Sequence, residues 1–373
     1  MKKEAKQFKV TPWEVSGKID YARLAKEFGI KPFPPLPKIF KDNVLFRREV
    51  IFAQRDIERI LEAIKKKKPF VMMTGLMPTG KFHVGHMLVA QQMIFYQKLG
   101  AKVYIAVADI ESMHARNQTL EEARKIAIEE YLTNYIALGL KPKNCEIYFQ
   151  SERSKDGKKA SAYYLLQNQL AKHVTFNEFK AVYGTISPGK MVSSLLQAAD
   201  MFHPQLKEFE GPMPIVVPVG ADQDPHLRLA RDMGRRIKTH KFTQLSSTYH
   251  KFIPGLGGGK MSSSNPNSFI ALTDSPKEVK NKINRHAFSG GQPTLEEHRK
   301  KGGNPDIDIS YQYLRMFFEP NDKKLKQIYD NYRSGKLLTG ELKAYLIDKI
   351  NSFLAKHQKE REKAKKAIHK YFK

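Results

Sequence analysis

The chain has 373 residues, of which 41% are hydrophobic, and 65 lysines and arginines against 38 aspartates and glutamates give it a formal charge of +27. This composition excludes a disordered chain, and the length predicts two or more domains. The positive charge favours a polyanionic partner, although the lysine-rich surface of a thermophile would carry the same charge without one. The single cysteine excludes a disulfide framework and a cysteine-rich zinc module.

Signals for secretion or membrane insertion are absent from the sequence. Met1 leads into polar residues rather than a signal peptide, and no apolar run reaches the roughly 18 residues that span a bilayer. We therefore expect a cytoplasmic protein without a membrane partner.

Strands that alternate with helices are predicted over the first two thirds of the chain. Residues 1–54 resemble a proline-rich leader, so the organised part is expected to begin near Pro69. Four short apolar runs predict buried strands, at residues 70–73, 102–108, 146–149 and 214–219. Helices are predicted after three of them, at residues 83–100, from Thr119 and from about Pro225. The alternation predicts an α/β fold with a parallel, doubly wound sheet.

A change of pattern near Asp274 predicts a domain boundary. Ser275-Pro276-Lys277-Glu278 combines an N-cap, a proline at the first helical position and a capping glutamate. From there the pattern is helical, with no convincing strand. We therefore expect three parts: an N-terminal extension at 1–60, an α/β domain at 61–275 with a helical insertion at roughly 152–212, and an all-helical domain at 276–373.

The first motif is Pro78-Thr79-Gly80-Lys81-Phe82-His83-Val84-Gly85-His86, at a predicted strand-to-helix turn. A helix N-terminus points backbone N–H groups at a bound phosphate, and Gly85 in the first turn lets a nucleotide approach the backbone. His83 and His86, three residues apart, share one helical face and can donate ring N–H bonds to phosphate oxygens. The pair could instead supply two zinc ligands, but cysteine or acidic partners at ligand spacing are missing nearby, so no metal site is expected.

The second motif is Lys260-Met261-Ser262-Ser263-Ser264, which follows a stretch with four glycines at 252–259. Such a loop alone could be a plain linker. Together with the histidine motif it predicts a mobile loop whose Lys260 can bring an ammonium group to bound phosphates, while the serine hydroxyls add donors. Such groups position phosphates and stabilise charge that develops on their oxygens.

In this order, the two motifs resemble the His-x-Gly-His and Lys-Met-Ser-Lys-Ser elements of class I aminoacyl-tRNA synthetases, with Ser263 where many members carry lysine. Further segments are similar to the archaeal and eukaryotic branch of the tryptophanyl-tRNA synthetases, at residues 172–177, 220–225, 287–291, 302–306 and 338–343. The similarity runs from about residue 8 almost to the C-terminus.

The resemblance implies a Rossmann-like catalytic domain, a helical anticodon-binding domain, a homodimer, and activation of tryptophan by Mg²⁺-ATP before transfer to tRNA(Trp). It implies catalytic roles for His83, His86, Lys260 and Ser262. The residues implied in ATP binding are Thr79, Gly80, Gly85, Gly220, Asp222, Met261, Ser263 and Ser264. Those implied in amino-acid binding are Met73, Ala106, Glu111, Gln197 and Gln223. Basic residues of the helical tail are expected to contact tRNA phosphates, among them Arg361, Lys363, Lys365, Lys366 and Lys370.

Two amino-acid-binding positions depart from the family's pattern. Eukaryote-like relatives carry tyrosine and glutamine, which bond the indole N–H, where this chain has Met73 and Ala106. The indole nitrogen therefore needs another acceptor, which the sequence does not identify. A tyrosine-specific paralogue is the main alternative. A small-molecule nucleotidyltransferase would not need the basic helical tail, and a catalytically silent tRNA-binding relative would not need His83, His86 and Lys260.

Overall fold

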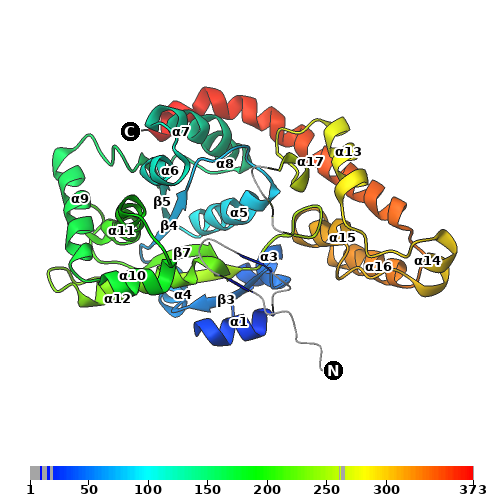
Figure 1. The fold of residues 1–373 in the computed structure, drawn as a ribbon, viewed down its shortest axis with the longest axis horizontal. Coiled ribbons are helices and arrows are strands. Elements are labelled where there is room, and N and C mark those ends of the chain that lie inside the picture. Colours follow the sequence, from blue (N-terminus) through cyan, green and yellow to red (C-terminus); the bar gives the residue numbers. More distant parts are fainter. Residues whose placement is uncertain (1–8, 11–14, 17–19, 260, 262–264, 373) are drawn as a thin grey trace.

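The structure is a computed structural model that describes residues 9–10, 15–16, 20–259, 261 and 265–372. Its centre is a six-stranded sheet in the order β3-β8-β7-β4-β5-β6 (Figure 1). The strands are β3 Ile51–Arg55, β4 Val71–Leu76, β5 Lys102–Val107, β6 Cys145–Phe149, β7 Ile215–Gly220 and β8 Ser246–His250. Five strands are parallel, and β3 pairs antiparallel with β8 at one edge.

Successive residues of the central strands enter two different cores. Met72 and Val103 belong to one cluster of buried residues, whereas Met73 and Tyr104 belong to the other. Because side chains alternate across a strand, a sheet covered on both faces needs apolar residues at every position. Burial of both faces therefore explains the apolar runs that predicted β4, β5, β6 and β7. All four strands are confirmed.

Helices cover both faces of the sheet, as expected for the predicted α/β fold (Figure 1). The first core is shared with α5 Val84–Lys98 and α8 Thr133–Leu138. The second core is shared with α9 Gly157–Ala171, α10 Phe176–Tyr183, α11 Pro188–Phe202 and α12 Asp224–Arg236. Two shorter helices follow β5, namely α6 Asp109–Arg116 and α7 Leu120–Ile126. No described helix combines the length and apolar character needed to cross a bilayer.

The remainder of the chain is helical, as predicted. It comprises α13 Pro276–His286, α14 Leu295–Lys301, α15 Ile309–Tyr313, α16 Asp322–Arg333 and α17 Thr339–Ala367, with a π-helix at Leu314–Phe318. The predicted capping box at Ser275 opens α13. The last helix, α17, packs against α13, α15 and α16 and then runs back across the molecule to α8 and α7 (Figure 1). Leu354 of α17 accordingly belongs to the same buried cluster as Tyr135 of α8.

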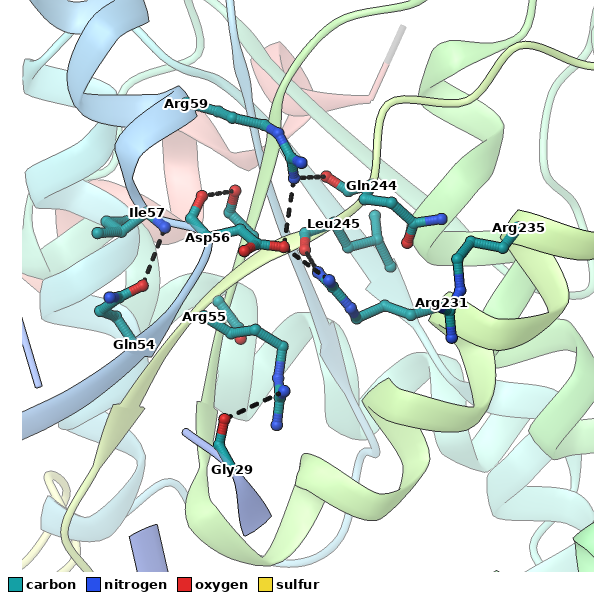
Figure 2. Close-up of polar contacts among 12 residues, drawn as sticks. Gly29, Gln54, Arg55, Asp56, Ile57, Arg59, Arg231, Arg235, Gln244 and Leu245 are labelled. Atoms are coloured by element: carbon teal, nitrogen blue, oxygen red, sulfur yellow. Dashed lines mark hydrogen bonds and ion pairs between the residues drawn. The ribbon is translucent and has the colours of Figure 1, made fainter. Parts of the chain in front are cut away.

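The expectation that residues 1–54 are a leader and that the organised part begins near Pro69 is wrong. The segment contains α1 Tyr21–Phe28, α2 Lys38–Asp42, α3 Val44–Arg47, strand β3 and α4 Glu58–Lys65. The expected extension at 1–60 therefore includes an edge strand of the main sheet. Figure 2 shows how the turn after β3 is fastened: Asp56 forms an ion pair with Arg231 of α12 at 2.6 Å, and the side-chain oxygen of Gln54 accepts the Ile57 N–H at 3.0 Å.

Candidate active site

Most of the predicted residues that the structure describes lie at the carboxyl ends of the parallel strands, around three adjoining cavities. The outer cavity has a volume of about 1460 Å³ and is bounded by the start of α5 and the glycine-rich loop. Two smaller cavities of about 480 and 200 Å³ share Gly75, Gln197, Asp200, Gln223 and His226, and we call them together the inner pocket. Gln223 lines all three cavities. A ligand in the inner pocket would therefore meet one in the outer cavity beside this side chain.

His83 and His86 line the outer cavity and also cap the helix they open. The His83 Nδ1 atom accepts the Gly85 N–H at 3.1 Å, and the His86 Nδ1 atom accepts the His83 N–H at 3.1 Å. The two rings stack with centroids 3.8 Å apart. Because each Nδ1 is an acceptor, the proton of each neutral ring lies on Nε2, which is the donor available to a ligand.

Burial keeps both imidazoles uncharged. It lowers the pKa of His83 to about 4, and it lowers the pKa of His86 well below the ordinary value, with a further contribution from the neighbouring His83. Near neutral pH the pair therefore offers two N–H dipoles rather than two positive charges. Among the residues that the structure describes, no group of three or more His, Cys, Asp or Glu is placed for a metal ion.

The small residues of the first motif have different roles. A Cβ atom on Gly85 would lie 2.7 Å from His83 Cε1 and 2.9 Å from Met261 Sδ, so the glycine makes room for the imidazole and for the second motif. Thr79 lines the outer cavity together with Gly220 and Asp222. Gly80 does not: it adopts φ +66°, which favours glycine, and lines a neighbouring cavity between the motif and α13.

The second motif is only partly visible. Gly257, Gly258, Gly259 and Met261 line the outer cavity together with His83 and His86. Lys260, Ser262, Ser263 and Ser264 lie outside the described residues.

Parts of the outer cavity come from segments outside the two motifs. Tyr21 of α1 lines it, and its hydroxyl accepts the Phe252 N–H at 2.8 Å. Phe288, Arg315 and Met316 contribute from the helical region after residue 275. The outer cavity thus lies between the α/β part and the helical part of the chain. A sequence motif could not have indicated Tyr21, because the residue stands alone in the segment that resembled a leader.

The inner pocket contains most of the predicted amino-acid-binding residues. Glu111 and Gln197 line its larger cavity, and Met73 and Gln197 line the smaller one. Ala106 is fully buried in β5, paired in register with Gly75 of the pocket wall. Burial, with the charge of Asp200 adding to it, raises the pKa of Glu111 to about 7.

Asp200 is a residue of the inner pocket that the sequence analysis missed. Its carboxylate lines both cavities of the inner pocket and is only 2% exposed. It accepts hydrogen bonds from the hydroxyls of Tyr148 and Tyr163 at 2.7 and 2.6 Å and from Gln150 Nε2 at 2.7 Å. Burial raises its pKa to about 6 despite these donors. The sequence could have indicated Asp200 through its position, because it lies three residues after Gln197 and therefore on the same face of α11.

The chain is similar to known proteins over nearly its whole length. The model of the family described as tRNA synthetases class I (W and Y) matches residues 65–355. The tryptophan–tRNA ligase of Aeropyrum pernix is 46% identical over 363 residues, which cover 96% of this chain and 96% of that protein. The tryptophan–tRNA ligase of Methanocaldococcus jannaschii is 43% identical over 366 residues, or 96% of this chain and 97% of that protein.

Solved structures show the same similarity. The crystal structure of the tryptophanyl-tRNA synthetase from Aeropyrum pernix K1 matches with a TM-score of 0.89 and 45% identity, over 95% of this chain and 96% of that one. The tryptophanyl-tRNA synthetase of Plasmodium falciparum matches with a TM-score of 0.82 and 31% identity, over 95% of each chain.

Proposed function

The chain belongs to the class I tRNA synthetases of the W and Y family. We propose from its site which residues bind ATP, which bind tryptophan and which stabilise the transition state. Its reaction is the ATP-dependent activation of L-tryptophan followed by transfer to tRNA(Trp). The tyrosine-specific alternative is not favoured, because tryptophan–tRNA ligases match nearly the whole chain at 46% and 43% identity. The main observation behind this assignment is that Gln223 lines both the inner pocket and the outer cavity, so that tryptophan in one would meet ATP in the other.

In the first step a carboxylate oxygen of tryptophan forms a bond to the α-phosphorus of ATP, and the bond to the β-phosphate oxygen breaks to release pyrophosphate. ATP occupies the outer cavity, with Asp222 and Gly220 at its ribose. The Nε2–H groups of His83 and His86 donate to phosphate oxygens on which charge develops. Preorganised donors of this kind stabilise a transition state without reorganisation during the reaction. Lys260 and Ser262 of the loop complete this group of donors.

Tryptophan occupies the inner pocket with its carboxylate toward Gln223. Glu111 pairs with its ammonium group, and Gln197 adds an amide partner, because a buried ammonium needs such acceptors. Asp200 accepts the indole N–H. A carboxylate has about four lone-pair positions, and Asp200 uses three of them for Tyr148, Tyr163 and Gln150. The fourth position replaces the acceptors that family members place at the positions of Met73 and Ala106.

ATP enters as its Mg²⁺ complex. Mg²⁺ keeps several waters and is bound mainly through substrate phosphates with one or two carboxylates. The outer cavity fits this mode, since Asp222 and Asp306 line it while the histidine Nδ1 atoms are engaged by backbone N–H groups. The ion would neutralise phosphate charge as pyrophosphate leaves.

The protein acts as a homodimer in the cytoplasm, where tRNA is charged. Large apolar side chains are exposed on the neighbouring helices α6, α9 and α11, namely Met113 at 38%, Leu165 at 58% and Val192 at 45%. A second copy would cover them, as exposed apolar patches mark association sites. The helices α13–α16 take the anticodon stem-loop, whose unstacked bases side chains can read. Light scattering of the wild type and of Leu165→Lys tests the dimer.

ATP–pyrophosphate exchange with each of the twenty amino acids, followed by tRNA charging, tests the reaction itself. We expect exchange with tryptophan and at least a hundredfold preference over tyrosine, whose smaller ring leaves part of the pocket empty and buries a hydroxyl without a designed partner. Equal exchange with tyrosine would overturn the proposed pocket.

A further inference from the structure

A π-helix lies directly against the first motif. The segment Ala127–Leu132 joins α7 to α8, and π turns inside α-helices occur frequently at functional sites. The Tyr131 hydroxyl donates to the Thr79 carbonyl at 2.9 Å and accepts the Thr79 N–H at 3.4 Å. The carboxylate of Glu130 accepts the Phe82 N–H at 3.3 Å. Two adjacent side chains thus hold both ends of the turn at 79–82.

The ring of Tyr131 adds packing to these bonds. It meets Phe82 edge-on with centroids 5.6 Å apart and approaches His86 at 5.1 Å. The side chain is only 2% exposed. One tyrosine therefore contacts the start, the middle and the end of the motif, including a proposed catalytic histidine.

The π-helix is itself fixed by the last helix, α17. The Arg361 guanidinium donates to the Glu129 carbonyl at 2.6 Å and pairs with Glu130 at 3.5 Å, and its side chain is 11% exposed. One turn earlier, His357 bonds Asn134 Oδ1 at 2.7 Å, and the Asn134 amide donates to the Glu130 carbonyl. Arg361 was expected to contact tRNA phosphate. The structure corrects that expectation, because the guanidinium is already engaged by these groups.

The same helix holds the segment on the other side of the motif. Gln358 Nε2 donates to the carbonyls of Leu272 and Asp274 at 3.2 and 3.1 Å. The Leu272 N–H in turn donates to the Phe82 carbonyl at 3.0 Å. The turn that opens α5 therefore lies between two segments that are both tied to one stretch of α17.

We propose that Tyr131, Glu130 and Arg361 are positioning residues for adenylate formation: the end of α17 fixes the π-helix, and the π-helix fixes the phosphate-facing turn and His86. The proposal rests on the ATP-binding role proposed above for the first motif. Its physical basis is that displacement of a catalytic group by about 1 Å costs roughly a hundredfold in rate. The C-terminal helix is then part of the activation machinery, and not only of the tRNA-binding region.

Tyr131→Phe tests the first contact, since it removes the hydroxyl and keeps the ring. We expect kcat for tryptophan-dependent pyrophosphate exchange to fall about tenfold, the effect of one lost hydrogen bond, with both KM values and the Tm nearly unchanged. Tyr135→Phe is the matched control, because Tyr135 lies one turn further on and meets the same Phe82 ring edge-on at 5.5 Å. Among the described residues its hydroxyl bonds none of residues 79–82, so kcat should be unchanged.

Arg361→Gln tests the remote contact. We expect a lower kcat at saturating ATP and tryptophan, and recovery of much of it in Arg361→Lys, which restores the charge beside Glu130. A lowered Tm with an unchanged kcat in Arg361→Gln, or a full kcat in Tyr131→Phe, overturns the proposal. Failure of the proposed function is distinguishable, because the wild type would then show no tryptophan-dependent exchange at all.

Discussion

The His86 Nδ1 atom accepts the His83 backbone N–H across 3.1 Å, while the His83 Nδ1 atom accepts the Gly85 N–H at the same distance. The first motif is therefore a helix cap, and in the proposed mechanism it is also a pair of ligand donors. In that proposal each ring uses Nδ1 for the fold and Nε2–H for the substrate, which makes the two uses separable by mutation.

Replacing His83 by Asn or by Gln should separate its capping of α5 from its proposed donation to the substrate. Asparagine reproduces the capping acceptor but does not reach as far as Nε2, whereas glutamine reaches that far without capping well. We expect His83→Asn to keep the Tm and to lose about a hundredfold or more in exchange rate, the value of one preorganised donor. His83→Gln should lower the Tm but keep more of the exchange rate. Thermal melts and pyrophosphate exchange on both variants test this prediction, and equal exchange rates would refute the Nε2 assignment.

Lys260 carries the second prediction. Lys260→Ala should lower the rate of adenylate formation about a hundredfold or more, because one donor to developing charge is worth roughly 3–4 kcal/mol. Binding of tryptophan should change less. Single-turnover formation of the adenylate is the measurement. A wild-type rate would remove Lys260 from the mechanism while leaving the histidines in place.

Asp200 offers the most specific test of substrate choice. Asp200→Asn should raise KM for tryptophan roughly 10- to 100-fold, because hydrogen bonds to charged groups contribute about 1.5–3 kcal/mol. The wild type should discriminate against 1-methyltryptophan, which lacks the indole N–H, and the variant should discriminate much less. Asp308→Asn is the control, since Asp308 is also buried but lies in the helical region. Undiminished discrimination in Asp200→Asn would assign the indole acceptor elsewhere.

The sequence predicted those parts of the fold and site that have a local chemical cause. The strands β4 and β7 are apolar because both faces are covered, and the histidine motif is compact. Strand β8 was missed because its Ser246, Ser247 and Thr248 are polar yet fully buried. Their hydroxyls find partners only in the folded protein, such as the Gln92 side chain for Thr248 at 3.0 Å. Asp200 and the π-helix were missed for the same reason, because their surroundings are formed by segments that are distant in the sequence.

The pH dependence of tryptophan binding should follow Glu111. Its pKa is raised to about 7 by burial and by the charge of Asp200. Below pH 7 the carboxyl is protonated and cannot pair with the ammonium group, and above pH 7 it is ionised. KM for tryptophan should therefore fall as the pH rises from 6 to 8. Glu111→Gln should have a higher KM that depends less on pH, with any remaining slope near pH 6, where Asp200 titrates. An undiminished slope between pH 7 and 8 in that variant would identify another group.

The last prediction concerns tRNA. The domain boundary predicted near Asp274 suggests a chain truncated there as a test, because such a chain keeps the two motifs. In the structure such a chain would lose α17, and with it the buried contacts of Leu354 with the first core and of Arg361 with Glu130. We therefore expect the truncated protein to lose exchange as well as charging, which leaves the two functions unresolved.

Charge reversal at single lysines can separate tRNA binding from the activation of tryptophan. Lys300, Lys323 and Lys336 are exposed on or beside α14 and α16, in the helical region proposed to take the anticodon. Replacing each by Glu should raise KM for tRNA and reduce the salt dependence of tRNA binding by about one unit of slope per lost phosphate contact. Exchange with tryptophan should stay at the wild-type rate. Lys98→Glu is the matched control, an exposed lysine at the end of α5 in the α/β part. If all three variants charged tRNA like the wild type at every salt concentration, α14 and α16 would not face the anticodon stem.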